Sequence, residues 1–176
     1  AELVPRDGGT LIVVQADPIV VPPGIVATST APGVQMLGGR VEPASADDEI
    51  VRLSEADAPA MLALATLTKP GPFARRTPSL GEFWGVEIEG RLVAMAGERL
   101  RHAGHTELSG VCTHPDARGR GLARRLSAWV ASRIAARGEI PYLHAYASNT
   151  AAIELYRSLG FEMHRTMHVA TLARRE

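Results

Sequence analysis

The stretch most informative about the fold is residues 111–126, which read VCTHPDARGRGLARRL. A strand-like run ends at Thr113, a tight turn with two glycines follows, and a helical apolar pattern begins near Gly121. The backbone N–H groups at a helix start have no intrahelical partner and carry partial positive charge, so they can bind phosphate. Gly119 and Gly121 let the backbone approach such a ligand without an intervening Cβ. This strand, turn and helix therefore predict an anion site.

Four arginines crowd the same turn, at positions 118, 120, 124 and 125. A helix start favours carboxylates, and each cation there costs about 0.3–1 kcal/mol, so a bound polyanion is the simplest compensation. A P-loop is excluded because no lysine followed by Ser or Thr comes after the last glycine. A Rossmann turn fits poorly, because Arg124 stands where a small residue is needed and Glu139 precedes the next strand. A solvated, arginine-rich helix start is the alternative.

Strands and helices alternate around this turn. Apolar spacing predicts one helix from Ser54 and a longer one over 117–137, while Glu89-Gly90 predicts a hairpin and Gly110 a bulge. This alternation is typical of an α/β domain with some parallel pairing. The predicted strands are 50–53, 83–89, 91–100, 106–113, 142–147 and 161–171, and a short helix is predicted over 149–159.

Residues 1–48 form a separate region rich in proline and glycine. Its short β-branched runs at 11–14, 19–21 and 25–27 are separated by prolines, which cannot donate to a central ladder. We therefore predict a β-rich N-terminal extension over 1–48, built from short edge strands, and an α/β domain over 49–176. A loose arm is the alternative for the extension.

The composition limits the possible classes of protein. With 45% hydrophobic and 22% charged residues and no net charge, the 176-residue chain is neither disordered nor fibrous. No apolar run approaches the roughly 18 residues that span a bilayer, and no signal-like segment opens the chain, so we expect a cytoplasmic location without a membrane partner. The single cysteine, Cys112, excludes an intrachain disulfide, and the six histidines have no metal-ligand spacing. The arginines lack an aromatic stacking platform, so no nucleic-acid partner is expected.

Two motifs resemble those of the GNAT acyltransferases. The sequence RGRGLA at 118–123 resembles their acetyl-CoA motif, Arg/Gln-x-x-Gly-x-Gly/Ala, and NTAAIELYRSLGF at 149–161 resembles the motif that follows it. The resemblance implies a GNAT fold over 49–176, which is a mixed, splayed β-sheet flanked by helices. Three segments are further similar to the FR47-like branch of the family: 69–73, 111–115 and 155–161.

The resemblance also implies the cosubstrate and its site. Acetyl-CoA would lie with its pyrophosphate on the turn and its pantetheine between strands 106–113 and 142–147, without a metal. The backbone contacts would come from Val111 and Thr113, and strand alternation places the Cys112 side chain on the opposite face as a small buried hydrophobe. Asn149 is also a good helix N-cap. The implied cofactor-binding residues are Val111, Cys112, Thr113, Arg118, Gly119, Arg120, Gly121, Leu122, Ala123, Arg124 and Asn149.

Acyl transfer to an amine benefits from a general base. An amine of pKa about 10.4 is mostly protonated at pH 7, and neutralising it costs about 4.6 kcal/mol. The resemblance to histone-type members assigns the base to Glu107. A tyrosine hydroxyl can donate a proton to the leaving thiolate, and the family's matching tyrosine lies beside the CoA sulfur, so the resemblance implies that Tyr156 is the acid. The residues themselves leave two alternatives open, namely a surface glutamate at a strand end and a core tyrosine whose hydroxyl bonds backbone.

We therefore expect an N-acetyltransferase that moves the acetyl group of acetyl-CoA directly to a primary amine on a small molecule or a peptide. The competing class is a non-catalytic acyl-CoA-binding or sensing module, and a nucleotide is the third choice of ligand. The acceptor is not specified by the fold, although loop 67–80 is expected to shape its site. A homodimer and a monomer are both open.

Overall fold

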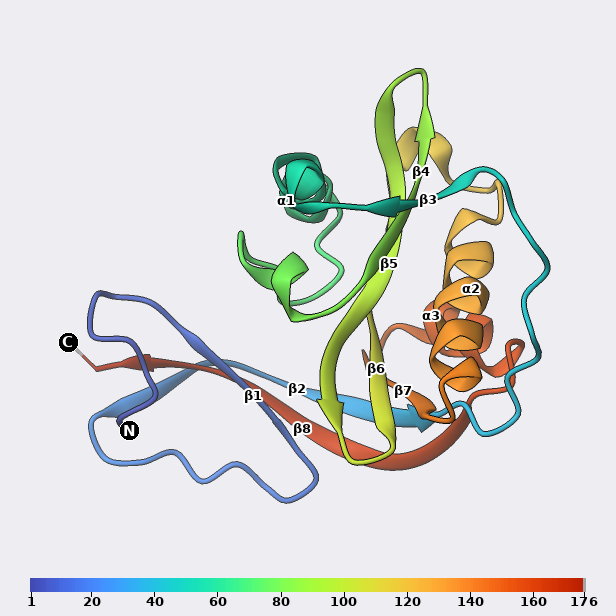
Figure 1. The fold of residues 1–176 in the computed structure, drawn as a ribbon. Coiled ribbons are helices and arrows are strands. Elements are labelled where there is room, and N and C mark those ends of the chain that lie inside the picture. The colour runs from blue at the N-terminus through green and yellow to red at the C-terminus, as the bar shows by residue number, and fades with distance from the viewer. Residues whose placement is uncertain (176) are drawn as a thin grey trace. The chain divides into compact units, whose positions relative to one another are not determined.

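The computed structural model describes residues 1–175, which fold into eight strands and three α-helices (Figure 1). The strand order β1-β8-β2-β7-β6-β5-β4-β3 makes an open mixed sheet flanked by helices, which confirms the predicted α/β class. The strands are β1 (Leu11–Gln15), β2 (Ile25–Leu37), β3 (Ile50–Leu53), β4 (Phe83–Ile88), β5 (Arg91–His102), β6 (His105–Thr113), β7 (Ile140–Tyr146) and β8 (Glu162–Arg174). The helices are α1 (Ala58–Thr68), α2 (Leu122–Ala136) and α3 (Thr150–Arg157).

The chain divides into two compact units. One comprises Ala1–Met36, His144–Ile153 and the chain from Met163 onward, and the other comprises Leu37–Leu143 and Glu154–Glu162. The first unit therefore holds β1 and most of β2 and β8. The second holds β3 to β6 together with α1 and α2, and so contains the arginine and glycine turn.

The first unit is a small sheet with its own apolar core. Strand β1 pairs antiparallel with β8, with Leu11 opposite Leu172, so the strand predicted at 11–14 is confirmed. The strand predicted at 19–21 is wrong, because this segment lies outside every described strand. The flanking prolines explain the difference, since a proline has no N–H for a ladder. The core side chains are Val4, Ile25, Ala170 and Leu172.

Strand β2 also differs from the prediction. The run at 25–27 is the beginning of a strand that continues to Leu37 and lies between β8 and β7 in the strand order, so it is not an edge strand. It contains Pro32, whose carbonyl accepts a hydrogen bond from the Ala147 N–H at 3.0 Å. An interior strand tolerates this proline because the carbonyl still pairs even though the nitrogen cannot donate.

The second unit contains the antiparallel series β3 to β6 and the start of β7. The hairpin predicted at Glu89-Gly90 is confirmed, and both residues have positive φ, at 52° and 71°, as a two-residue type I′ turn requires. The bulge predicted at Gly110 is confirmed by the register shift opposite it, between Met95 and Gly97 of β5. Strand β6 runs parallel to β7, and their pairing extends from His105 to Glu107 on β6.

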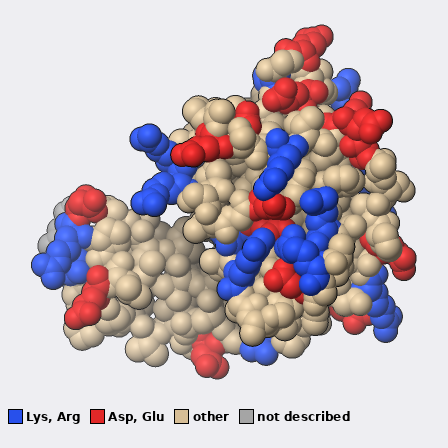
Figure 2. Space-filling view, viewed as in Figure 1, with Lys and Arg blue, Asp and Glu red and all other residues tan. Residues whose placement is uncertain are grey.

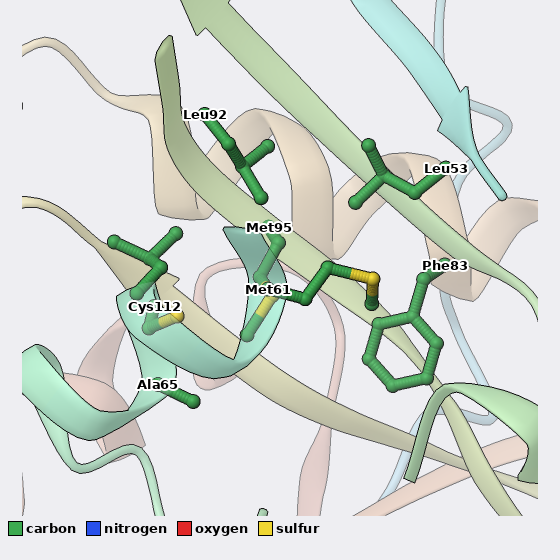
Figure 3. Close-up of a cluster of buried hydrophobic side chains, with 8 residues drawn as sticks. Leu53, Met61, Ala65, Phe83, Leu92, Met95 and Cys112 are labelled. Atoms are coloured by element: carbon green, nitrogen blue, oxygen red, sulfur yellow. The ribbon is translucent and has the colours of Figure 1, made fainter. Parts of the chain in front are cut away.

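Helices α1 and α2 lie on opposite faces of the β4–β6 sheet (Figure 1). On the α1 face, the ring of Phe83 packs directly over Gly97 of the neighbouring strand, and a Cβ at Gly110 would lie 3.0 Å from the same ring. Two glycines on adjacent strands therefore make room for one aromatic ring. The apolar cluster on this face consists of Leu53, Met61, Leu64, Ala65, Phe83, Leu92, Met95 and Cys112 (Figure 3).

Helix α2 is shorter than predicted. The first residues of the predicted helix 117–137 belong instead to a 3-10 turn at Pro115–Ala117 and to an irregular link before Leu122. Left-handed backbone in this link interrupts helical hydrogen bonding, which explains the late start. The predicted apolar face is confirmed by the burial of Leu126, Val130 and Ile134. Across residues 1–175 no helix combines the length and the apolar character needed to cross a membrane.

Candidate active site

The turn between β6 and α2 requires both of its glycines. Gly119 and Gly121 have φ of 77° and 72°, a left-handed backbone that costs other L-residues about 1–2 kcal/mol. Nothing lies within 4 Å of a Cβ built at either position. The glycines are thus needed for the shape of the turn, and the space in front of the turn is open to a ligand.

Helix α2 begins without any local compensation for its N-terminal amides. Among the described residues no side chain caps it, and its first turn contains no acidic residue. The first intrahelical bond runs from the Arg125 N–H to the Gly121 carbonyl at 3.0 Å, so the amides of the preceding positions point out of the helix. Uncompensated amides at a helix start favour an anion.

The four arginines of the turn differ in their partners. Arg125 donates to Asp47 at 2.6 and 2.7 Å and to Glu49 at 2.6 Å, and the Arg125 guanidinium lowers the pKa of Asp47. Our expectation that a polyanion must compensate all four cations is therefore wrong for Arg125, because two carboxylates already do so. Basic and acidic side chains lie next to each other in several places on the face shown in Figure 2.

Arg124 links α2 to the end of α3. Its guanidinium donates to the Ser158 hydroxyl and, at 3.2 Å, to the Ser158 carbonyl. This contact brings the start of α2 to a position two residues beyond Tyr156. For Arg118 and Arg120 no side-chain partner is described within residues 1–175, so these two side chains are the ones that remain for an anion.

The strand residues assigned to the cofactor lie on both faces of β6. Cys112 packs into the α1-side cluster, as predicted, and burial raises the pKa of its thiol to about 11. A thiol with this pKa stays protonated near neutrality and is a poor nucleophile. Val111 and Thr113 lie beyond the part of β6 that pairs with β7, and the buried Thr113 Oγ1 has no hydrogen-bond partner among the described residues.

Glu107 lies in an ion pair inside the second unit. Its side chain is 1% exposed, and its two oxygens accept from Arg99 Nε and Nη2 at 2.9 and 3.1 Å. The alternative of a surface glutamate is therefore wrong. Burial and the charge of Glu107 together raise the pKa of Tyr142 to about 12. Arg99 also donates to the Pro72 carbonyl at 3.3 Å, which ties this pair to the loop after α1.

Tyr156 is a buried residue whose ring meets Phe161 edge-on at 5.9 Å between centroids. Burial raises the pKa of its hydroxyl to about 12, so the hydroxyl is neutral at pH 7 and able to donate. In the first unit, Asn149 Oδ1 accepts from the Ala152 N–H at 3.2 Å, which confirms that Asn149 caps α3.

Comparison with known proteins identifies the family. A crystal structure of a protein of the GNAT family from Novosphingobium aromaticivorans is 47% identical to this chain, and the two superpose with a TM-score of 0.94. The match covers 99% of this chain and 78% of that one. The chain belongs to the GNAT family. The family model for FR47-like proteins matches residues 85–169, which confirms the resemblance to that branch of GNAT proteins. No functionally curated protein matches the chain.

Two more distant GNAT structures share the fold alone. The ribosomal-protein-S18-alanine N-acetyltransferase of Escherichia coli is 23% identical, with a TM-score of 0.59 over 71% of this chain and 92% of its own. A GCN5-related N-acetyltransferase from Kribbella flavida is 22% identical with a TM-score of 0.59, and the alignment covers 84% of this chain but 60% of that protein's length.

Two features of the site were missed at the level of sequence. Arg99 contacts Glu107 across the β5–β6 hairpin, where the register shifts between Glu98 and Arg101. Symmetric pairing about the turn would place Leu108 opposite Arg99, so no simple hairpin pattern indicates this pair. The pairing of Arg125 with Asp47 spans 78 positions and also has no local signal. Within residues 1–175, no group of acidic, histidine or cysteine side chains is arranged to hold a metal ion.

Proposed function

We propose that this GNAT protein is an N-acetyltransferase that transfers the acetyl group of acetyl-CoA directly to a primary amine. The observation that carries the proposal is the uncompensated start of α2, where two left-handed glycines expose helix amides to open space. This arrangement fits a pyrophosphate, because helix amides and unpaired guanidinium groups both favour phosphate.

The residues of the turn and of β6 would hold the cosubstrate. The amides from Gly119 to Arg124 and the side chains of Arg118 and Arg120 would bind the pyrophosphate. The backbone of Val111 and Thr113, beyond the β7 pairing, would bind the pantetheine. Acetyl-CoA would supply an activated acetyl thioester.

Glu107 is proposed as the general base. The carboxylate of Glu107 lies on β6 and faces the Arg99 guanidinium, and an ammonium group of the acceptor would be attracted to its negative charge. The base must offset about 4.6 kcal/mol, the cost of neutralising an amine of pKa about 10.4 at pH 7. Burial strengthens this contact, because opposite charges interact more strongly away from water.

Tyr156 is proposed as the donor to the leaving sulfur. With a pKa of about 12, against roughly 8.5 for an ordinary thiol, complete proton transfer to the thiolate would be uphill by about 4.8 kcal/mol. A hydrogen bond to the sulfur that strengthens as negative charge develops avoids this cost. The hydroxyl can therefore stabilise the transition state before the proton moves.

The competing proposal is a non-catalytic acyl-CoA-binding module. It is favoured by the burial of Glu107 and by the engagement of both its oxygens with Arg99. The experiment that separates the two is the release of free CoA thiol from acetyl-CoA in the presence of amines, amino acids and peptide amines, with mass detection of the acetylated product. Acetyl-CoA binding without turnover on any amine would support the module, and equal protection from unfolding by ADP and acetyl-CoA would support a nucleotide ligand.

A further inference from the structure

A cavity of about 830 Å³ opens on the α1 face of the second unit. Its walls come from the end of β3, the first turns of α1, the loop around residues 75–81 and the start of β4. Apolar side chains from the α1-face cluster form much of the wall, including Leu53, Met61 and Phe83 (Figure 3). The cavity is large enough for a small-molecule or peptide ligand.

Two arginines give this apolar cavity a charged side. Arg75 and Arg76 both line it, and within residues 1–175 no ion pair or hydrogen bond of either guanidinium is described. Other arginines of the unit, such as Arg52, have carboxylate partners. One carboxylate, Glu55, also lines the cavity, so the lining carries a net charge of +1 at neutral pH. The matching ligand is a single carboxylate on an apolar segment, because guanidinium groups bind carboxylates through paired hydrogen bonds.

The loop that follows α1 and the ring of Phe83 both extend from the cavity toward the strand that carries Glu107. Arg99, the partner of Glu107, donates to the Pro72 carbonyl in the loop that leads to Arg75. Phe83, which lines the cavity, packs toward the bulge of β6 at Gly110. Phe83 lies on β4 and Glu107 on β6, and because these strands flank β5, the cavity wall at Phe83 and the strand that carries Glu107 lie about 10 Å apart. An extended chain of about three residues covers this distance.

We propose that the cavity binds the carboxylate of the acceptor, and that the acceptor is a peptide-like amine whose amine and carboxylate are about three residues apart. The proposal rests on N-acetyltransfer at Glu107. A free α-amino acid carries both groups on one carbon, so it cannot place its amine at Glu107 and its carboxylate at Arg75 and Arg76 together. The carboxylate can be a chain terminus or an acidic side chain at the third position.

The test compares peptides that differ only in this charge. We expect Ala-Leu-Leu as a free acid to have a KM at least tenfold lower than its C-terminal amide, and the acid and amide of alanine alone to differ by less than threefold. A second pair, amidated Ala-Leu-Glu-Leu and amidated Ala-Leu-Gln-Leu, tests whether the carboxylate can come from a side chain at the third position. A preference for the acid in either pair supports the proposal and identifies the source.

Variants locate the effect in the cavity. The double variant Arg75→Gln/Arg76→Gln should abolish the difference between acid and amide, whereas Lys69→Gln, which removes a cation from the same loop but outside the lining, should retain it. Equal KM values for acid and amide in the unaltered protein, or an equal loss in the Lys69 control, would overturn the proposal.

Calorimetry of peptide binding in the presence of CoA keeps this test separate from the proposed activity. Preferential binding of the acid that depends on Arg75 and Arg76, without acetylation of any peptide, would retain the carboxylate pocket and reject the transferase. Acetylation of amines with no acid preference in either KM or Kd would reject the pocket and retain the transferase.

Discussion

Replacing Gly121 by alanine distinguishes the conformational role of this residue from a role in binding. With a φ of 72° the new Cβ is strained, but it meets no atom within 4 Å, so we expect the free energy of unfolding to fall by about 1–2 kcal/mol. The methyl group would stand where a pyrophosphate oxygen approaches the first amides of α2. Losing one charge-assisted hydrogen bond of about 1.5–3 kcal/mol weakens CoA binding by about 10- to 150-fold.

The matched control is Gly138→Ala, just beyond the other end of α2. Gly138 has a φ of 76° and the same open surroundings, so its replacement carries the same strain without touching the turn. Urea unfolding should show similar losses for both variants, and calorimetric titration with CoA should show weaker binding for Gly121→Ala alone. Unchanged CoA affinity in folded Gly121→Ala would refute the assignment of the turn to the pyrophosphate.

Four further outcomes are expected. Glu107→Gln should lower turnover per folded molecule by about 10²–10⁴ with little change in CoA affinity. Urea unfolding should show a loss of up to about 3–5 kcal/mol, because the partly buried Arg99 loses its counter-charge. A turnover loss below threefold would contradict the base role. Tyr156→Phe should reduce turnover, and an acyl donor with a more acidic thiol should recover part of it; wild-type rates with both donors would exclude the hydrogen-bond role. Arg125 lowers the pKa of Asp47 from 3.8, so the pair stabilises the fold above about pH 4. This stabilisation is lost as the pH falls through the lowered pKa. The urea midpoint of Asp47→Asn should therefore fall less between about pH 5 and 2 than that of the unaltered protein. With a thiol pKa of about 11, Cys112 should react with an alkylating reagent at pH 8 far more slowly in the folded than in the urea-unfolded protein, as mass spectrometry can measure.

Local patterns predicted much of the second unit. The hairpin at Glu89-Gly90 and the apolar face of α2 depend on residues a few positions apart, and the structure confirms both. The helix start near Gly121 is confirmed, whereas the range 117–137 begins too early, because the left-handed link before Leu122 depends on backbone angles that an apolar pattern does not encode.

Contacts between distant segments could not be predicted in this way. Asp47 lies 78 positions before Arg125, and nothing near either residue indicates the pair. The interior position of β2 differs from the predicted edge strands, because Pro32 lacks an N–H but still pairs through its carbonyl.

The packing of Phe83 over Gly97 and beside Gly110 has a consequence for how the family diverges. A side chain at position 97 would collide with the aromatic ring, and one at position 110 would crowd it, so neither position can change freely while position 83 stays aromatic. We expect these three sites to covary among relatives: a larger residue at position 97 or 110 should accompany an aliphatic residue at position 83. Because Phe83 also lines the cavity, such a coupled exchange would reshape the cavity. Substitutions at positions 97 and 110 would therefore change which ligand fits the cavity without altering Glu107 or Tyr156.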